Sequence, residues 1–142
     1  MGYNSDEISV IPGQSLTVKV KAASASMERG QFVCLDSDGE AVLTDADATA
    51  TSRALGVIVD ISGRGGMNKD ETAIGDSVEV CFMGIVDGFT SLVEGPQYLG
   101  LTAGEITHTA PTAGGDSVSV AALAVSQTRI IVGIAAGDIA TH

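Results

Sequence analysis

Aromatic side chains are scarce in this sequence, which has no tryptophan, two tyrosines and three phenylalanines among its 142 residues. Carbohydrate-binding modules and adhesins use exposed aromatic rings to stack on sugars. The scarcity of such rings disfavours that functional class, which we keep as an alternative.

Basic residues are also few, since seven Lys and Arg stand against eighteen Asp and Glu, for a net charge of −11. A phosphate-binding surface needs clustered Lys or Arg, whereas these seven are spread along the chain. We therefore expect no binding to nucleic acid. The closest pair, Lys19 and Lys21, alternates along one predicted strand, where lysines commonly protect a solvated sheet edge from pairing.

Long apolar runs are missing as well, because no stretch approaches the roughly 18–20 residues of a membrane span. The first residues, Met1 to Glu7, carry neither the basic nor the apolar region of a signal peptide. These features predict a protein that is neither exported by a signal peptide nor held in a membrane. Cys34 and Cys81 lie in apolar, strand-like runs, so we expect two reduced, buried thiols.

Glycine and β-branched residues are abundant, and apolar residues alternate with polar ones in many short segments. Alternation with period two indicates half-buried strands, such as the one that carries Leu16, Val18 and Val20. No segment sustains a 3.6-residue period. We predict an all-β protein with little helix, a small β-barrel or sandwich-like domain. The expected strands lie at roughly 15–21, 31–35, 40–44, 55–61, 76–82, 97–101, 105–109, 117–124 and 129–133.

Some segments are ambiguous from sequence alone. Residues 22–29 suit either one helical turn or a loop, and residues 45–53 suit either a short helix or a loop. Gly84 interrupts an apolar run, so we expect a bulge or bend there. Residues 133–142 form a tail of small residues.

Residues 1–14 are predicted to form an extended N-terminal arm, closed by Pro12 and Gly13, while residues 15–142 form a single β domain. The arm has too few hydrophobic residues to pack alone, and free termini are normally mobile unless they are tied down. We therefore expect it to face a partner, and deletion of residues 2–12 to leave the domain folded while weakening attachment. The candidate partner-binding residues are Tyr3, Ile8, Val10 and Ile11.

Two sequence patterns recur and predict two related sub-units, about 15–88 and 89–142. Gly30 precedes a Gly-Glu pair at Gly39 by nine residues, and Gly95 precedes a Gly-Glu pair at Gly104 by the same spacing. The string Gly-Asp-Ser-Val occurs at 75–78 and again at 115–118. Glycine permits a left-handed turn, and Asp or Ser can bond the backbone where a strand begins. Chance in a biased composition is the alternative explanation.

One acidic segment, Asp36-Ser37-Asp38-Gly39-Glu40, superficially resembles the start of a calcium loop. An EF-hand loop requires a bidentate Glu at position twelve and flanking helices. Position twelve counted from Asp36 is Asp47, and the flanks are predicted strands. The segment therefore favours a hairpin turn, and we predict no metal site and no cofactor.

Candidate catalytic groups are equally weak. Cys81 and His108 are the most conceivable nucleophile and base, but a reactive thiol needs an electropositive setting, and Cys81 lies between Val80 and Phe82 in an acidic chain. No G-x-S-x-G elbow, P-loop or G-x-G-x-x-G motif is present. We predict that the protein has no catalytic residues and is not an enzyme.

Several short segments follow one another in a recognisable order: a glycine, an apolar strand and an Asp-rich turn, then Ala-Leu-Gly-Val, then a Gly-Asp strand that ends in glycine. These segments are Gly30 to Gly39, Ala54 to Val57, Gly75 to Val80 and Gly84 to Val86. In this order the chain resembles the capsid decoration, or cement, proteins of tailed bacteriophages, over roughly residues 15–133. The second half also resembles phage virion sequence, in the segments Gly95 to Leu99, Gly104 to Thr107, Thr109 to Thr112 and Gly115-Asp116.

The resemblance implies a structural virion protein on the outer surface of a phage capsid, made in the host bacterial cytoplasm. Such proteins bind the expanded shell and clamp neighbouring subunits of the major capsid protein, which would be the partner here. A homo-oligomer, most simply a trimer at a local three-fold position, fits that role. The alternatives are another phage virion β domain, such as a head-fibre base or a tail-associated part, and the carbohydrate-binding module or adhesin.

Overall fold

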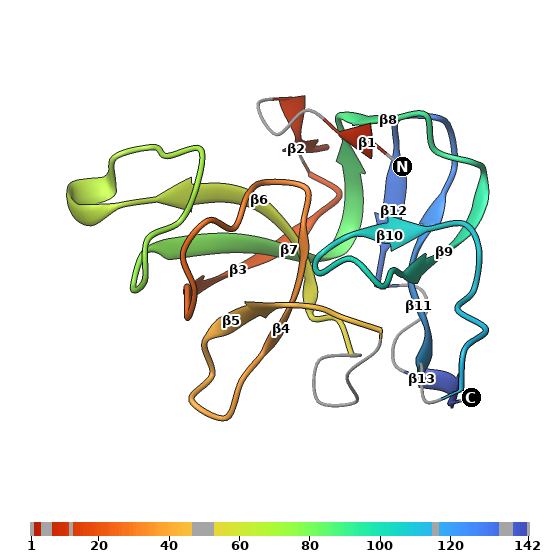
Figure 1. Cartoon of the computed structure of the whole chain (residues 1–142). Helices are drawn as coiled ribbons and strands as arrows, with labels where there is room; N and C mark the ends of the chain where they lie inside the picture. Colours follow the sequence, from red (N-terminus) through yellow and green to blue (C-terminus); the bar gives the residue numbers. More distant parts are fainter. Residues whose placement is uncertain are drawn as a thin grey trace.

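The computed structural model describes residues 2–3, 7–11, 13–46, 53–114, 117–133 and 138–141, and this part of the chain is nearly all β-structure (Figure 1). The all-β prediction is confirmed. Arg64–Gly66 form a short 3-10 turn, η3, and none of the described segments is a helix that could span a membrane. The strands are β1 (Gly2–Tyr3), β2 (Ser9–Val10), β3 (Leu16–Lys21), β4 (Phe32–Leu35), β5 (Ala41–Leu43), β6 (Gly56–Ser62), β7 (Ser77–Asp87), β8 (Phe89–Thr90), β9 (Gly95–Leu99), β10 (Ile106–Thr107), β11 (Ser117–Ala124), β12 (Ile130–Val132) and β13 (Asp138–Thr141).

The long strand β7 is the spine of the main sheet, and all of its neighbours are antiparallel to it. Along one side it pairs with β3 and then with β2, and along the other side with β6 and then with β12. The sheet continues from β6 through β4 to β5, and from β12 through β11 and β9 to β10. Figure 1 shows the β6–β7 pair reaching out to the left and the second branch on the right.

The two branches curl toward each other and form an antiparallel half-barrel. Their outer hairpins are joined by backbone hydrogen bonds. The Phe32 amide donates to the Gly104 carbonyl at 2.8 Å, and the Gly104 amide donates to the Thr44 carbonyl at 2.7 Å. A further bond runs from the Ala46 amide to the Gly100 carbonyl at 3.1 Å. These contacts fasten residues that are far apart in sequence and fix the curvature of the sheet.

An irregularity is predicted at Gly84, and the structure has a bulge two residues earlier, at Phe82, inside one continuous strand. Leu16 pairs with Met83 whereas Thr17 pairs with Cys81, so Phe82 is the extra residue on β7. A bulge bends a strand and increases its twist. At this point β7 leaves its pairing with β3 and β6 and begins its pairing with β12, so the bend divides the two branches of the sheet.

Most of the buried apolar side chains of the described residues fall into two clusters. The larger lies between the branches and includes Phe32, Phe89, Leu99 and Ile130. The smaller, which we call the β3-side core, consists of Ala22, Met27, Val33, Ala41, Ile58, Ile61, Val78 and Val80. Each fully buried Val, Leu, Ile or Phe stabilises the fold by roughly 1.5–3 kcal/mol. The prediction for the two cysteines is confirmed, since Cys34 and Cys81 are buried free thiols.

The two predicted sub-units share an order of strands. In the first sub-unit, β4 and β5 form a hairpin, β6 pairs with β4, and β7 pairs with β6. In the second, β9 and β10 form a hairpin, β11 pairs with β9, and β12 pairs with β11. The two Gly-Asp-Ser-Val strings do not match within this order, because Ser77 begins β7, the fourth strand, and Ser117 begins β11, the third. Residues 115 and 116 lie outside the described chain. The relation between the sub-units stays a prediction.

Other details differ from the sequence expectation. Residues 22–29 form bends and turns without a helix. In the expected tail, residues 138–141 form β13, which pairs with β11. The ambiguous residues 47–52 lie outside the described chain.

Candidate interaction surface

The N-terminal segment is attached to the protein's own body over residues 7–11. Strand β2 pairs with the end of β7, and the Ile11 amide donates to the Ile85 carbonyl at 3.0 Å. Ile8 is 5% exposed and belongs to the larger core. Its predicted role in partner binding is therefore wrong, because its side chain already packs inside the chain. Val10 and Ile11 are half-buried, so their role stays a prediction.

Tyr3 is placed by its backbone alone. Strand β1 pairs with β8, and Tyr3 lies opposite Phe89 in that pairing. The Tyr3 side chain is outside the described part of the structure. Its predicted contact with a partner stays a prediction.

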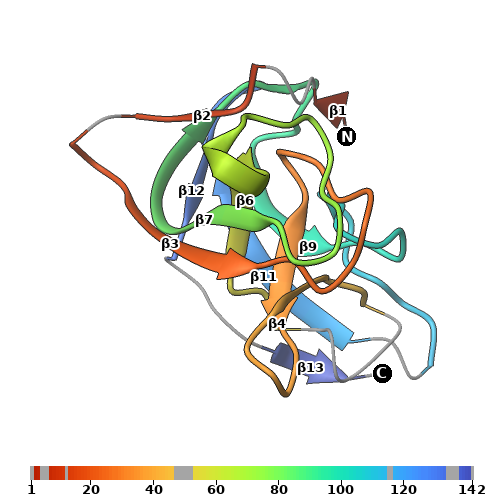
Figure 2. The ribbon, with the colours of Figure 1, turned by 90° about the vertical axis from the view of Figure 1, so that its left-hand side faces the viewer.

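Among the described residues, the outer edge of β3 is a six-residue backbone edge beside an exposed apolar surface. Over its whole length β3 pairs with β7 on one side, and in the described chain no strand pairs with its other side (Figure 2). The expectation that β3 is half-buried is wrong for two of its three apolar residues, since Leu16 is 54% and Val18 is 37% exposed. Val20 alone packs against the β3-side core. Met83, which pairs with Leu16, is 50% exposed and continues this surface.

Charges alternate with apolar residues along the same strand. Lys19 lies opposite Glu79 of β7, and Glu79 lies opposite Asp60 of β6. Asp60 in turn lies 3.9 Å from the Arg29 guanidinium. Asp60, Glu79 and Lys19 therefore form one row of charged residues across the sheet. Arg29 lies beside Asp60 at one end of the row, and Lys19 lies at the open edge. Within the described chain, Lys19 and Lys21 form no ion pair.

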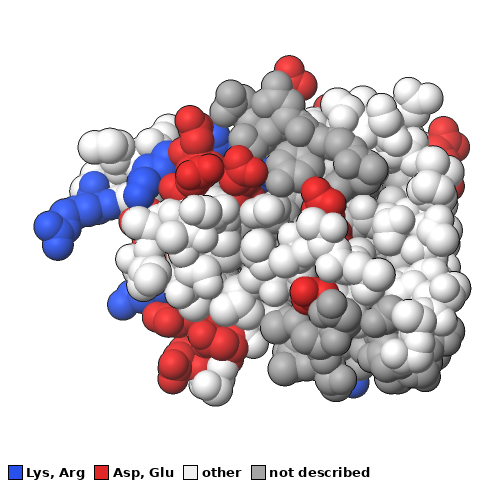
Figure 3. Space-filling view, viewed as in Figure 1, with Lys and Arg blue, Asp and Glu red and all other residues white. Residues whose placement is uncertain are grey.

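The distribution of charge over the molecule is uneven. Figure 3 shows basic and acidic side chains gathered on the left, near the end of the β6–β7 pair, and a second acidic group below it. The right-hand part of this face, over β9 to β12, carries few charges. This weakly charged part of the surface costs little to desolvate, which favours contact with another protein.

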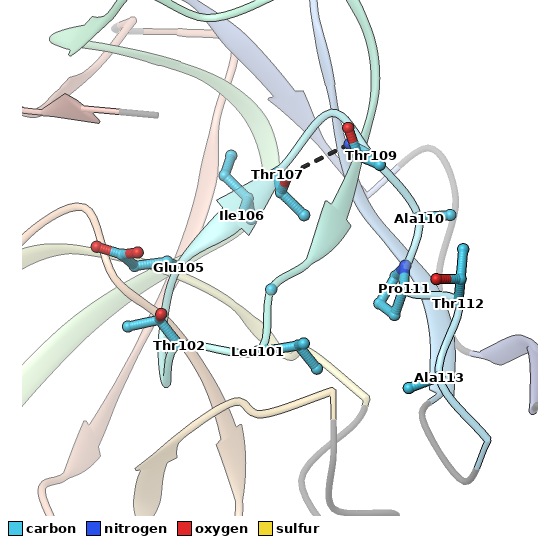
Figure 4. A pocket seen from close by; sticks show the side chains of 11 residues that line it. Leu101, Thr102, Glu105, Ile106, Thr107, Thr109, Ala110, Pro111, Thr112 and Ala113 are labelled. Carbon is cyan, nitrogen blue, oxygen red and sulfur yellow. Dashed lines mark hydrogen bonds between the residues drawn. The ribbon is translucent and has the colours of Figure 1, made fainter.

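A groove of about 480 Å³ lies between the loop at 100–105 and the segment 106–113. Figure 4 shows Leu101 pointing toward Pro111 and Ala113, while Glu105 points away from them. The Thr109 amide donates to the Thr107 hydroxyl at 3.2 Å across a tight turn. Glu105 is the single titratable residue among the residues that line the groove. The hydroxyl and small apolar groups that line the groove can hold a ligand by shape, but they supply no pair of groups for general acid–base catalysis.

The acidic segment forms the predicted hairpin turn. The Asp36 carboxylate accepts hydrogen bonds from the backbone amides of Asp38 at 2.9 Å and Glu40 at 3.0 Å. Gly39 adopts a φ of 77°, which suits glycine. Carboxylate oxygens of Asp36, Asp38 and Glu40 lie within 4.8 Å of one another at the surface. The Asp36 carboxylate already binds the turn, so the cluster is explained by the local structure.

The two side chains considered as a catalytic pair lie in different environments. Cys81 is fully buried, and burial raises the pKa of its thiol above the ordinary value. Its sulfur lies 3.5 Å from the Met83 carbonyl. His108 is exposed in the turn after β10. The raised pKa opposes formation of a thiolate, which agrees with Cys81 as a buried core residue.

An ion pair closes the loop at the end of the β6–β7 pair. The Lys69 ammonium pairs with the Asp76 carboxylate, which also accepts the Ala73 amide at 2.7 Å. The hydrogen bond from Lys69, and then that from Ala73, lowers the pKa of Asp76 below its ordinary value. A lowered pKa in the folded state stabilises the loop above the unfolded pKa of about 3.9, and this stabilisation is lost as pH falls through the folded pKa.

Replacing Asp76 by asparagine is therefore expected to speed hydrogen exchange of the Ala73 amide at neutral pH. The difference from the wild type should shrink as pH falls through the pKa of Asp76. Amide exchange followed by NMR over this pH range measures both effects. Asp38→Asn, at an exposed site in the β4–β5 turn, is the matched control and should leave Ala73 unchanged. If the Ala73 amide exchanged at the same rate in D76N and in the wild type at pH 7, the Lys69–Asp76 ion pair would not contribute to the stability of the loop.

Comparison with protein-family models and with curated proteins gives no match for this sequence.

Proposed function

We propose that this protein is a structural component of a tailed-phage virion that binds the outer surface of the capsid and clamps neighbouring major-capsid subunits. The observation that supports this role best is the exposed apolar surface on a rigid β body, beside an open strand edge. An external clamp requires a stiff body and apolar contact area. The sequence resemblance to capsid decoration proteins supplies the identity of the partner.

The structure offers contact area at several places. Apart from the β3 edge, exposed apolar side chains lie at the end of the β6–β7 pair and around β9 and β11. Exposed apolar patches on soluble proteins commonly mark sites of interaction with other proteins. The charge of −11 would face solvent around these contacts and limit self-association in the cell. These additional residues are Met67, Ile74, Val93, Leu101 and Val125.

Phage heads that lack this protein are expected to assemble but to lose DNA about tenfold faster on heating or chelation. A tenfold change in rate corresponds to about 1.4 kcal/mol in the barrier to rupture. The measurement is DNA release from purified heads with and without the protein, followed by dye fluorescence. Adding the purified protein back should restore stability, with a saturating stoichiometry fixed by capsid symmetry.

The same heads, imaged with and without the protein, test its location. Density should appear on the outside of the shell at symmetry-related positions, and the purified protein should not bind DNA. Location in tails alone, or heads of unchanged stability, would rule out the clamp and favour another virion part.

A further inference from the structure

We propose that the outer edge of β3 binds an extended, acidic segment of a partner protein and adds it to the sheet as a further strand. This inference deepens the proposed function, on which the identity of the partner as a capsid subunit rests. The chemistry of the edge can be tested without the capsid. The bound segment would alternate acidic residues with apolar ones.

The backbone of β3 supplies the first part of this site. β3 runs from Leu16 to Lys21 with β7 on one side, and on its other side the described chain places no strand. An edge strand presents a row of N–H and C=O groups that can pair with another chain. Strand addition of this kind gives affinity through main-chain hydrogen bonds and specificity through alternate side chains.

The apolar side chains of β3 supply the second part. Val18 lies opposite Val80, and Val80 lies opposite Ile58, so the three form one row across the sheet. Val80 and Ile58 are fully buried members of the β3-side core, whereas Val18 is 37% exposed. The row thus ends at the open edge with its last apolar residue only partly covered. A further strand with an apolar residue at this position would complete the cover of the core.

The lysines determine which strand fits. Lys19 and Lys21 alternate with Val18 and Val20, and opposite charges directly across two strands are favourable. β7 already shows the complement of β3 on its inner side, with Glu79 opposite Lys19. A partner on the outer side would meet the same pattern of side chains. It should carry acidic residues two positions apart, with an apolar residue between them.

A second copy of β3 is a poor occupant of the same edge. Pairing β3 antiparallel to β3 with the apolar faces together places lysines of the two copies directly opposite or diagonal to each other. Like charges opposite each other destabilise a pair of strands. The lysines therefore oppose self-association at this edge, as lysine commonly does at exposed edges, and leave it free for an acidic partner.

The test uses the full-length protein and a capped synthetic peptide, Gly-Ser-Val-Asp-Val-Glu-Val-Ser-Gly, with a fluorescent label. The peptide should bind saturably, as measured by anisotropy. Hydrogen exchange should slow at amides within Leu16–Lys21 when the peptide is bound. The other outer strand of this branch, Ala41–Leu43, carries no lysine and should keep its exchange rates.

Charge reversal identifies the side chains that select the peptide. The double variant Lys19→Glu with Lys21→Glu should bind the acidic peptide at least about tenfold more weakly, since two favourable pairs become repulsive. It should prefer a peptide with lysine in place of Asp and Glu. Charge reversal at Lys19 also places two carboxylates opposite each other within the protein, because Glu79 is the residue across from Lys19 on β7. The neutral variant Lys19→Gln with Lys21→Gln avoids this repulsion and is the second test. It should show an intermediate loss of affinity for the acidic peptide. Arg64→Glu is the matched control, since Arg64 is an exposed cation in the loop of η3 and should not affect binding.

The outcomes separate this inference from the proposed function. Failure of the acidic peptide to bind, equal binding by the charge-reversed variant, or protection outside β3 would overturn the inference. A concentration-dependent dimer that protects β3 would also overturn it, in favour of a second copy as the occupant. If the charge-reversed protein still saturates phage heads with wild-type affinity, the clamp remains and the β3 edge is not its contact.

Discussion

Replacing Gly84 by alanine is expected to lower the free energy of unfolding by about 3–5 kcal/mol, a large share of the stability of an ordinary domain. Gly84 has a φ of 133°, a conformation that side chains rarely adopt. A Cβ added there would lie 2.5 Å from the Cα of Ser15 and 2.6 Å from the carbonyl oxygen of Gln14. Both contacts are with backbone that leads into β3, so relief requires the start of β3 to move. Urea denaturation of the wild type and variant measures the difference.

Gly39→Ala is the matched control for the strain alone. Gly39 also has a positive φ, 77°, but a Cβ added to it would meet nothing within 4 Å. The expected loss is about 1 kcal/mol, from the left-handed conformation without a clash. If the two variants lost equal stability, the close approach of Gln14 and Ser15 to β7 at Gly84 would not contribute to the fold.

The strands could be predicted from sequence because alternation depends only on neighbouring residues. The segment around Val118 is an example, since its predicted bounds, 117–124, are those of β11. The full length of β7 was harder to foresee. The predicted strand covers only residues 76–82, with a bulge or bend expected at Gly84, yet β7 continues to Asp87, because backbone bonds to β2 and β12 hold the chain extended beyond the bulge. Those bonds involve residues distant in sequence, which a local pattern cannot report.

The candidate surface could be predicted only in part, for a related reason. Period two assigned Leu16, Val18 and Val20 to one face of β3 correctly, but it could not tell whether anything covers that face. The alternating lysines were the signal for an edge strand, and the structure places them there. What the sequence could not show is that the row from Ile58 through Val80 ends at this edge on Val18, which is only partly covered. Coverage depends on how the 22–30 segment and the β4–β5 hairpin pack, and this is set by long-range contacts.

The N-terminal segment is a second case in which long-range contacts decide the outcome. The sequence favours a free arm, whereas in the structure β2 pairs with β7 and Ile8 is buried in the larger core. An arm with few hydrophobic residues cannot pack alone, yet one isoleucine is enough when strand pairing already holds the backbone. Gly88 makes the docking possible, since a Cβ on it would lie 2.2 Å from the carbonyl oxygen of Glu7. We therefore expect that residues 2–12 are needed for full stability, contrary to the expectation from the sequence, because their removal would expose part of the larger core.

Replacing Ile8 by alanine is accordingly expected to lower the free energy of unfolding by about 3 kcal/mol, through lost burial and the cavity left in the larger core. Ile8→Val should lose only about 1 kcal/mol, because it removes a single methyl group. Val10→Ala, at a half-buried site on the same strand pair, is the matched control and should also cost less than Ile8→Ala. Urea denaturation measures all three, and exchange of the Ile11 amide reports whether the segment has detached from Ile85. A free arm gives a different result: Ile8→Ala would then unfold like the wild type, and its only effect would be weaker attachment to phage heads.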